Sequence, residues 1–207
     1  LGIKLLNYIS KNKISIFAAT CFKNERKILE QKSKHKIKHT FVLKNKNDQI
    51  KFLNILKIKI DIIYFLDYGS YSLNYLNHFL KFNSNSIIAI ANKELIIAGG
   101  SVLQKKIFSN KNIFIPLDSE HFSLINSNFN KTNIYKIYIT ASGGPFYFNR
   151  NIDLSKVSFK KVLSHPKWNM GNNNLIDSSN FINKILEIYE LSHIYDIPLS
   201  KIDFLIC

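Results

Sequence analysis

The feature that most constrains the fold of this chain is an alternation of short apolar runs with longer amphipathic segments over its first 116 residues. Apolar runs typical of buried strands lie at 13–19, 39–44, 60–66, 86–91 and 112–116. Segments with helical spacing of apolar residues lie at 1–12, 24–34, 48–57, 71–82 and 93–108. Strands that alternate with helices in this way predict an α/β fold, with a mostly parallel, doubly wound sheet covered by helices on both faces.

The pattern changes after residue 117. A strand is expected at 134–140, a helix at 153–164, an irregular loop at 165–174, a strong helix at 178–192 and a strand at 201–206. We therefore expect an incomplete Rossmann-like cofactor domain at 1–117 and a partial α+β catalytic domain at 118–207. A doubly wound fold normally opens with a strand and a Gly-rich turn. Here a helix comes first, so we expect the N-terminal strand to be missing.

The composition excludes several classes of protein. A hydrophobic content of 46% is typical of a folded globule rather than a disordered chain. No apolar run approaches the ~18 residues of a membrane span, so no membrane partner is expected. Cys21 and Cys207 lie far apart without a disulfide pattern. We therefore expect a reducing compartment, namely the cytoplasm, with a plastid-type organelle as the alternative.

The formal net charge of +15 is a possible sign of nucleic-acid binding. All but two of the cationic residues are Lys, however, because Arg occurs only at Arg26 and Arg150. Bidentate recognition of phosphates and bases usually depends on Arg. The chain is also rich in Lys, Asn, Ile, Phe and Tyr, which have AT-rich codons. We interpret the charge as compositional drift and expect no nucleic-acid partner; a basic nucleic-acid-binding protein with relict enzyme motifs is the alternative.

Two carboxylates follow the predicted strand at 112–116, in the segment LDSEH. Ligands of doubly wound sheets bind beyond the carboxyl ends of the strands. Asp118 and Glu120 lie at such an end, and Mg²⁺ and Mn²⁺ prefer oxygen ligands. The alternative is a helix start, with Asp118 as N-cap and Glu120 favoured by the helix dipole.

The predicted helix at 178–192 carries a second polar group. Asn183 and Glu187 are i, i+4 neighbours, and Lys184 lies three residues before Glu187. Ser178 is expected near the helix start, where backbone amides favour an anion. Hydroxyl, amide and ammonium groups together indicate a phosphate site. The alternative is a capped helix with one surface ion pair.

Three further segments lie where a ligand is expected. ANKE (91–94) follows a strand and offers an amide, an ammonium group and an acid to a nicotinamide cofactor or an oxyanion; the alternative is an ordinary loop. TASGGPF (140–146) allows close backbone approach to a ligand, with a plain turn as the alternative. HPKWNMG (165–171) offers a loop that closes over a substrate. Its alternative is a loop held against the core by Trp168.

Together, ANKE, LDSEH, TASGGPF, HPKWNMG and IDSSNFINKILE stand in the order and spacing of the 1-deoxy-D-xylulose 5-phosphate reductoisomerase family, which the chain resembles firmly over 86–206 and more weakly over 1–85. The resemblance implies conversion of a small phosphorylated sugar, 1-deoxy-D-xylulose 5-phosphate, into 2-C-methyl-D-erythritol 4-phosphate in the non-mevalonate isoprenoid pathway. It implies NADPH as the cofactor and Mn²⁺ or Mg²⁺ as the cation, with Co²⁺ as a further candidate. It also implies a homodimer for the full-length protein.

The resemblance implies roles for individual residues. The implied metal ligands are Asp118, Glu120 and Glu187, which form the implied catalytic set together with Lys93 and His165. The implied phosphate ligands are Ser142, Ser178, Asn183 and Lys184. Other implied substrate contacts are Ser119, Lys93 and His165, with Trp168 and Met170 in the closing loop. The implied cofactor contacts are Gly2, Lys23, Asn24, Asn92, Glu94 and Gly171.

The chain departs from the family pattern at several positions. Phe22 and Ile185 stand where the family has glycine, and Asn172 and Asn173 replace basic residues. The sequence stops at Cys207, before the family's C-terminal helical domain. We therefore expect a fragment with weak or no activity by itself. Within enzymes, another nucleotide-dependent reductase is the alternative function.

Overall fold

The computed structural model describes residues 1–125, 127, 133–147, 152–163 and 172–207. The chain divides into two compact units, each assembled from several segments. Unit 1 comprises Leu1–Asp67, Tyr71–Ala89 and Lys106–Phe114, and unit 2 comprises Tyr68–Ser70, Ile90–Lys105 and Ile115–Cys207. Residues 90–105 therefore group with the C-terminal part of the chain. The division into a cofactor domain and a catalytic domain at residue 117 stays a prediction.

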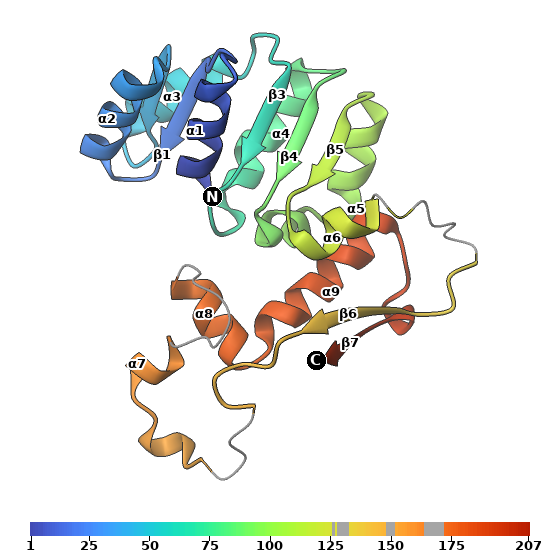
Figure 1. Cartoon of the computed structure of the whole chain (residues 1–207). Helices are drawn as coiled ribbons and strands as arrows, with labels where there is room; N and C mark the ends of the chain where they lie inside the picture. Colours follow the sequence, from blue (N-terminus) through green and yellow to red (C-terminus); the bar gives the residue numbers. More distant parts are fainter. Residues whose placement is uncertain (126, 128–132, 148–151, 164–171) are drawn as a thin grey trace. The chain divides into compact units, whose positions relative to one another are not determined.

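The first 116 residues form the predicted α/β alternation (Figure 1). The strands are β1 Ala18–Cys21, β2 His39–Val42, β3 Ile62–Phe65, β4 Ile87–Ile90 and β5 Ile113–Pro116. The helices are α1 Gly2–Lys11, α2 Glu25–His35, α3 Lys46–Ile55, α4 Leu73–Phe82 and α5 Lys93–Ser109, with a short 3₁₀ turn η1 at Ser70–Ser72. β1 and β2 pair in parallel, and a separate three-stranded sheet has the order β3-β4-β5.

Local sequence signals explain several of these boundaries. Asn24 begins α2 as its N-cap, because its side chain accepts a hydrogen bond from the backbone N–H of Lys27 at 3.1 Å. The α2 helix ends at His35, and its C-cap residue Lys36 has left-handed backbone geometry. In α4 the buried residues Tyr75, Leu76, Phe79 and Leu80 follow a helical period, so one face of this helix enters the core of unit 1.

Unit 2 continues beyond β5 with helices and a two-stranded parallel sheet. Its later elements are α6 Ser119–Ile125, β6 Ile137–Ala141, η3 Leu154–Lys156, α7 Phe159–Val162, α8 Asn172–Ser179, α9 Ile182–Tyr195, η4 Leu199–Lys201 and β7 Ile202–Ile206. Strands β6 and β7 pair in parallel, with Ile137 opposite Ile202. None of the described helices is long and apolar enough to cross a membrane.

Four sequence-based boundaries are wrong. β1 begins at Ala18, whereas the expected strand was 13–19, and the described residues 153–163 form the short elements η3 and α7 in place of the expected helix at 153–164. Asn172–Asn174 belong to α8 rather than to an irregular loop, and the expected helix at 178–192 is two helices.

The break between α8 and α9 lies at Phe181. Phe181 has a left-handed backbone (φ 64°), which a continuous helix excludes. Its ring stacks on Phe204 of β7 at 5.7 Å, and the Asn180 side chain accepts from the backbone N–H of Ile182 at 3.1 Å. Ser178 consequently lies at the end of α8, so its predicted position near a helix start is wrong.

The glycine pair of TASGGPF makes a close approach to α8. A Cβ atom on Gly144 would lie 2.8 Å from the backbone oxygen of Ser178 and 3.4 Å from the Cα of Ser179. Gly143 has φ 83°, a conformation that side chains rarely adopt. The segment after β6 is therefore packed against the end of the helix that carries Ser178.

Substitution Gly144→Ala is expected to lower the free energy of unfolding by about 1–3 kcal/mol, because a methyl group must displace backbone. Gly2→Ala is the matched control, since its added Cβ meets only Leu66 Cδ1 at 4.0 Å. Chemical denaturation of the two variants measures the difference. Equal stability of Gly144→Ala and the parent would contradict the close approach.

Candidate metal and substrate site

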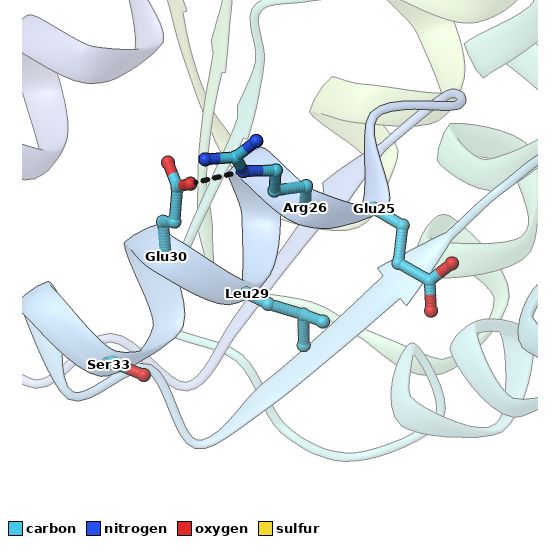
Figure 2. A pocket seen from close by; sticks show the side chains of 5 residues that line it. All are labelled: Glu25, Arg26, Leu29, Glu30 and Ser33. Atoms are coloured by element: carbon cyan, nitrogen blue, oxygen red, sulfur yellow. Dashed lines mark hydrogen bonds and ion pairs between the residues drawn. The ribbon is translucent and has the colours of Figure 1, made fainter.

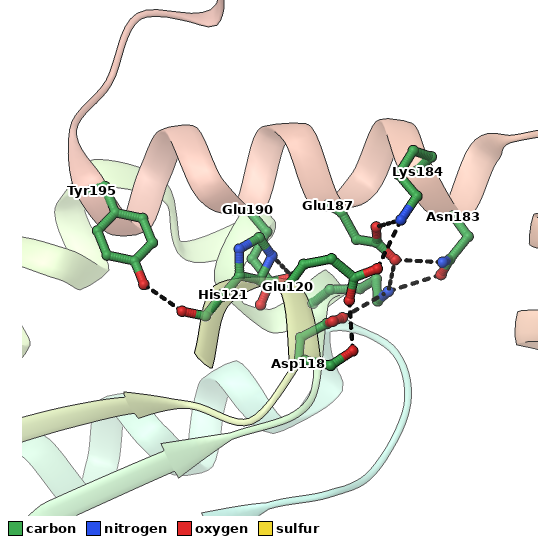
Figure 3. A network of polar contacts seen from close by, with 10 residues as sticks. Asp118, Glu120, His121, Asn183, Lys184, Glu187, Glu190 and Tyr195 are labelled. Carbon is green, nitrogen blue, oxygen red and sulfur yellow. Dashed lines mark hydrogen bonds and ion pairs between the residues drawn. The ribbon is translucent and has the colours of Figure 1, made fainter. Parts of the chain in front are cut away.

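Three carboxylates from distant parts of the sequence converge within unit 2 (Figure 3). Asp118 immediately precedes α6, Glu120 lies in its first turn, and Glu187 lies on α9. One oxygen of each carboxylate lies within 4.8 Å of the others. The helix-start interpretation of LDSEH also holds, because α6 begins at Ser119 and Phe122 N–H donates to the Asp118 carbonyl at 2.9 Å. The metal-ligand interpretation stays a prediction, and the same helix start places Asp118 and Glu120 in the carboxylate cluster.

Lys93, the first residue of α5, joins two of these carboxylates. Its Nζ lies 3.1 Å from Asp118 Oδ2 and 3.3 Å from Glu187 Oε1. It also donates to Asn183 Oδ1 at 2.8 Å. Only 9% of the Lys93 side chain is exposed, so the ion pairs are poorly screened by solvent. Lys93 thus holds the end of β5 and the first turns of α9 together.

Lys184 makes the corresponding bridge to the third carboxylate. Its Nζ lies 2.8 Å from Glu120 Oε1 and 2.5 Å from Glu187 Oε2. Ser119 Oγ donates to the other oxygen of Glu120 at 2.7 Å. Asn183 Nδ2 donates to Glu187 Oε1 at 2.5 Å. Glu187 is therefore the centre of the cluster, with contacts to both lysines.

Burial and charge act in opposite directions on the pKa values of this cluster. Burial raises the pKa of Glu187, and the charge of Lys93 lowers it. Glu120 and Asp118 raise it further, so the net shift of the pKa is upward. Burial also raises the pKa of Glu120, but hydrogen bonds with Asp118, Lys184 and Ser119 bring it down to about 2. Burial lowers the pKa of Lys93 and Lys184, but the neighbouring carboxylates raise it by more, so the pKa of both lysines is raised. Both lysines are therefore charged.

A second polar group in unit 2 was missed by sequence reasoning. His121 Nε2 and Glu190 Oε2 lie 2.9 Å apart, and both side chains are fully buried. Tyr195 Oη donates to the His121 carbonyl at 2.7 Å. The sequence held a signal, because His121 directly follows Glu120 and Glu190 lies one turn after Glu187 on α9.

The structure places the remaining predicted substrate residues as follows. Ser142 follows β6 and is half-buried, and Ser178 lies near the end of α8. The contact of Gly144 with the Ser178 carbonyl brings these two segments together. His165, Trp168, Met170 and Gly171 lie outside the described residues.

The predicted cofactor residues have different surroundings. Asn92 is buried, donates to the Gly69 carbonyl at 2.8 Å and accepts from Leu95 N–H at 2.9 Å, so it anchors the turn after β3 to the start of α5. Glu94 lies in the first turn of α5. In unit 1, Lys23 is exposed, Asn24 caps α2 and Gly2 begins α1.

Unit 1 also has an open hollow on α2 (Figure 2). It is lined by Glu25, Arg26, Leu29, Glu30 and Ser33. Arg26 Nε pairs with Glu30 Oε1 at 3.0 Å on an exposed helix face. None of the predicted site residues lines this hollow, and an exposed i, i+4 pair is an ordinary surface feature.

The donor set at Asp118, Glu120 and Glu187 fits a hard divalent cation. Three carboxylate oxygens within 4.8 Å of one another are chemically suited to Mg²⁺ or Mn²⁺. An ammonium group, a carboxamide and a hydroxyl group border them, from Lys184, Asn183 and Ser119. The arrangement therefore combines cation ligands with donors suitable for an anionic, oxygen-rich substrate.

Comparison with known sequences points to one family. The profile described as "1-deoxy-D-xylulose 5-phosphate reductoisomerase C-terminal domain" matches residues 114–195, which hold Asp118, Glu120 and Glu187. The reductoisomerase of Pelagibacter ubique is 46% identical over 124 residues, which cover 58% of this chain and 31% of the relative. That of Clostridium tetani is 29% identical over 231 aligned residues, covering all of this chain and 59% of the relative.

Solved structures show the same fold. The 1-deoxy-D-xylulose 5-phosphate reductoisomerase from Zymomonas mobilis in complex with NADPH has a TM-score of 0.79 and 22% identity, covering 97% of this chain and 57% of that one. A DOX-P reductoisomerase in complex with NADPH, fosmidomycin and magnesium has a TM-score of 0.69 and 22% identity, covering 99% and 52%. These likenesses confirm the predicted α/β class.

The chain spans between about a third and three fifths of the length of these curated relatives. The profile match begins within β5 and covers the acid pair and the helices α8 and α9, and Lys93 lies before it in the sequence. The order of motifs, the fold and the profile agree. Residues 114–195 of the chain therefore match the C-terminal domain of the 1-deoxy-D-xylulose 5-phosphate reductoisomerase family, and the curated relatives reported above carry that name.

Proposed function

We propose that the chain is part of an enzyme that converts 1-deoxy-D-xylulose 5-phosphate into 2-C-methyl-D-erythritol 4-phosphate with NADPH and a divalent cation. The single observation that carries this proposal is the convergence of Asp118, Glu120 and Glu187 within 4.8 Å, inside the segment that matches the family's C-terminal domain. A neighbour in fold is described in complex with NADPH, fosmidomycin and magnesium. Mg²⁺ or Mn²⁺ is the proposed cation, and Co²⁺ a further candidate.

The three carboxylates are the proposed ligands of the cation. When bound, such an ion acts as a Lewis acid on substrate oxygens, which assists both rearrangement of the carbon skeleton and reduction. Asp118 and Glu120 are fixed by the start of α6, and Glu187 by α9, so the ligands come from rigid elements. Lys93 lies between Asp118 and Glu187, where its ammonium group can also orient an oxygen of the substrate.

Lys184, Asn183, Ser142 and Ser178 are the proposed phosphate ligands. Lys184 now serves as counter-charge to Glu120 and Glu187. With those two carboxylates engaged by a cation, its ammonium group becomes available to a phosphate. The packing of Gly144 against Ser178 supports a site that includes the segment after β6 and the end of α8. Binding energy from the phosphate then positions the reacting end of the substrate.

The remaining roles stay predictions. Ser119 and His165 are proposed to contact the substrate, with Trp168 and Met170 in the closing loop. Gly2, Lys23, Asn24, Asn92, Glu94 and Gly171 are proposed to contact NADPH; for Asn92, the hydrogen bonds to Gly69 and Leu95 favour a role in shaping the turn. A homodimeric full-length protein and a cytoplasmic location are further proposals.

Mn²⁺ without substrate is expected to raise the melting temperature of the full-length protein. A ligand that binds only the native state raises the free energy of unfolding by about 2.7 kcal/mol when its concentration is a hundred times the Kd. Asp118→Asn should abolish most of this shift. Asp203→Asn is the matched control, because the Asp203 carboxylate on β7 is half-exposed and pairs with Lys136, which directly precedes β6, and with the backbone N–H of Phe204. A full shift in Asp118→Asn would count against the metal site.

Glu187→Gln in the full-length protein should reduce turnover by about a hundredfold or more, because it removes a ligand that contributes several kcal/mol of charge stabilisation. NADPH affinity should stay near that of the parent. Steady-state kinetics with Mn²⁺ and a fluorescence titration with NADPH measure the two quantities. Glu30→Gln, on the exposed face of α2, is the control. Ordinary turnover of Glu187→Gln would show that the metal assignment is wrong.

Lys184→Ala is expected mainly to raise the KM for the phosphorylated substrate, by about tenfold or more, because a charged contact to the phosphate is lost. Lys136→Ala is the control, since that lysine directly precedes β6 and forms a partly exposed ion pair with Asp203. Initial rates over a range of substrate concentrations separate KM from kcat. An unchanged KM would contradict the phosphate site.

A further inference from the structure

The buried pair of His121 and Glu190 has no role in the proposed function as stated so far. His121 Nε2 lies 2.9 Å from Glu190 Oε2, and both side chains are fully buried. Among the described residues, His121 Nδ1 and Glu190 Oε1 have no hydrogen-bond partner. Two buried polar atoms without partners are costly, and a well-packed apolar pair would stabilise a core at least as well. The pair therefore needs an explanation beyond core stability.

The position of the pair supplies one. His121 lies in the first turn of α6, directly after Glu120 and three residues after Asp118. Glu190 lies on α9, one turn after Glu187. Figure 3 shows the pair beside the three carboxylates, with the ring of His121 facing α9. The contact thus joins the two helices that hold the three acids, next to the point where those acids meet.

A second contact strengthens this connection. Tyr195, the last residue of α9, donates its hydroxyl hydrogen to the His121 carbonyl at 2.7 Å. One residue of α6 is therefore bound to α9 through both its side chain and its backbone. This restrains the α6 start both in distance and in rotation relative to α9.

We propose that His121 and Glu190 form a positioning pair, which holds α6 against α9 so that Asp118 and Glu120 face Glu187 at the separation one divalent cation requires. This inference rests on the proposed metal site. Partners of this kind behind metal ligands commonly tune affinity by about 10- to 100-fold. The competing assignment is direct ligation, because Asp118, His121 and Glu190 also offer atoms within 4.8 Å of one another.

The test is the Mn²⁺ affinity of the full-length protein without substrate or NADPH, measured by electron paramagnetic resonance of free Mn²⁺. Glu190→Ala should weaken binding about 10- to 100-fold. Glu190→Gln keeps the size of the side chain and an acceptor for His121 Nε2–H, so it should bind Mn²⁺ within about threefold of the parent. A direct ligand would be lost equally in both variants.

A matched control comes from another hydrogen bond to the same helix. Gln104 Nε2 donates to the Ile194 carbonyl at 2.8 Å, near the end of α9. Gln104→Leu removes this contact without touching α6, so Mn²⁺ affinity should not change. If Gln104→Leu lost as much Mn²⁺ affinity as Glu190→Ala, any weakened packing of α9 would explain the loss, and the proposal would be overturned.

Substitutions at His121 keep the test decisive if Glu190→Ala fails to fold. Glutamine places an amide nitrogen near the position of Nε2, whereas asparagine places one near Nδ1. His121→Gln should therefore retain Mn²⁺ binding, and His121→Asn should bind about tenfold more weakly. Equal affinities of these two variants would overturn the positioning role.

The result also distinguishes this inference from the metal site itself. If Asp118→Asn binds Mn²⁺ as well as the parent does, the proposed function has failed at its first step. If Asp118→Asn loses binding while Glu190→Ala retains parental affinity, the metal site stands and only the positioning pair is wrong. Equal loss in Glu190→Ala and Glu190→Gln would assign Glu190 as a ligand and also overturn the proposal.

Discussion

Mutual repulsion of three carboxylates is the constraint on which unit 2 depends. At separations up to 4.8 Å, each pair of ionised oxygens repels by about 3 kcal/mol or more at an effective dielectric constant of about 20. Lys93 and Lys184 offset this, because each bridges Glu187 to one of the other acids. The helices α6 and α9 must then be fixed firmly enough to keep the acids together, a requirement that the His121–Glu190 contact meets.

The fold was predictable where one local signal dominated. The sequence predicted α4 from the helical spacing of its buried residues, and β4 from a continuous apolar run. Both patterns are local and do not depend on residues distant in sequence. The division between α8 and α9 was not predictable, because Phe181 adopts a left-handed backbone while its ring packs on Phe204, a residue distant in sequence. Tertiary packing there overrides a continuous helical pattern.

The site was partly predictable for similar reasons. Motif order led to Asp118, Glu120 and Glu187, and the structure brings them together. The charge balance could not be predicted. The sequence predicts that Lys93 contacts the substrate, and the structure shows that it also forms ion pairs with Asp118 and Glu187. His121 and Glu190 were missed because a buried pair joins residues 69 positions apart, a separation at which no local pattern exists. Attention to the neighbours of predicted ligands on the same helix face would have found both.

The most direct measurement of the central claim is the anomalous scattering of Mn²⁺ in a crystal of the full-length protein. The account predicts one peak within liganding distance of carboxylate oxygens of Asp118, Glu120 and Glu187. It also predicts that His121 and Glu190 remain bonded to each other, outside the coordination sphere. A peak held by other residues, or a cation that leaves any of the three carboxylates beyond liganding distance, would contradict it.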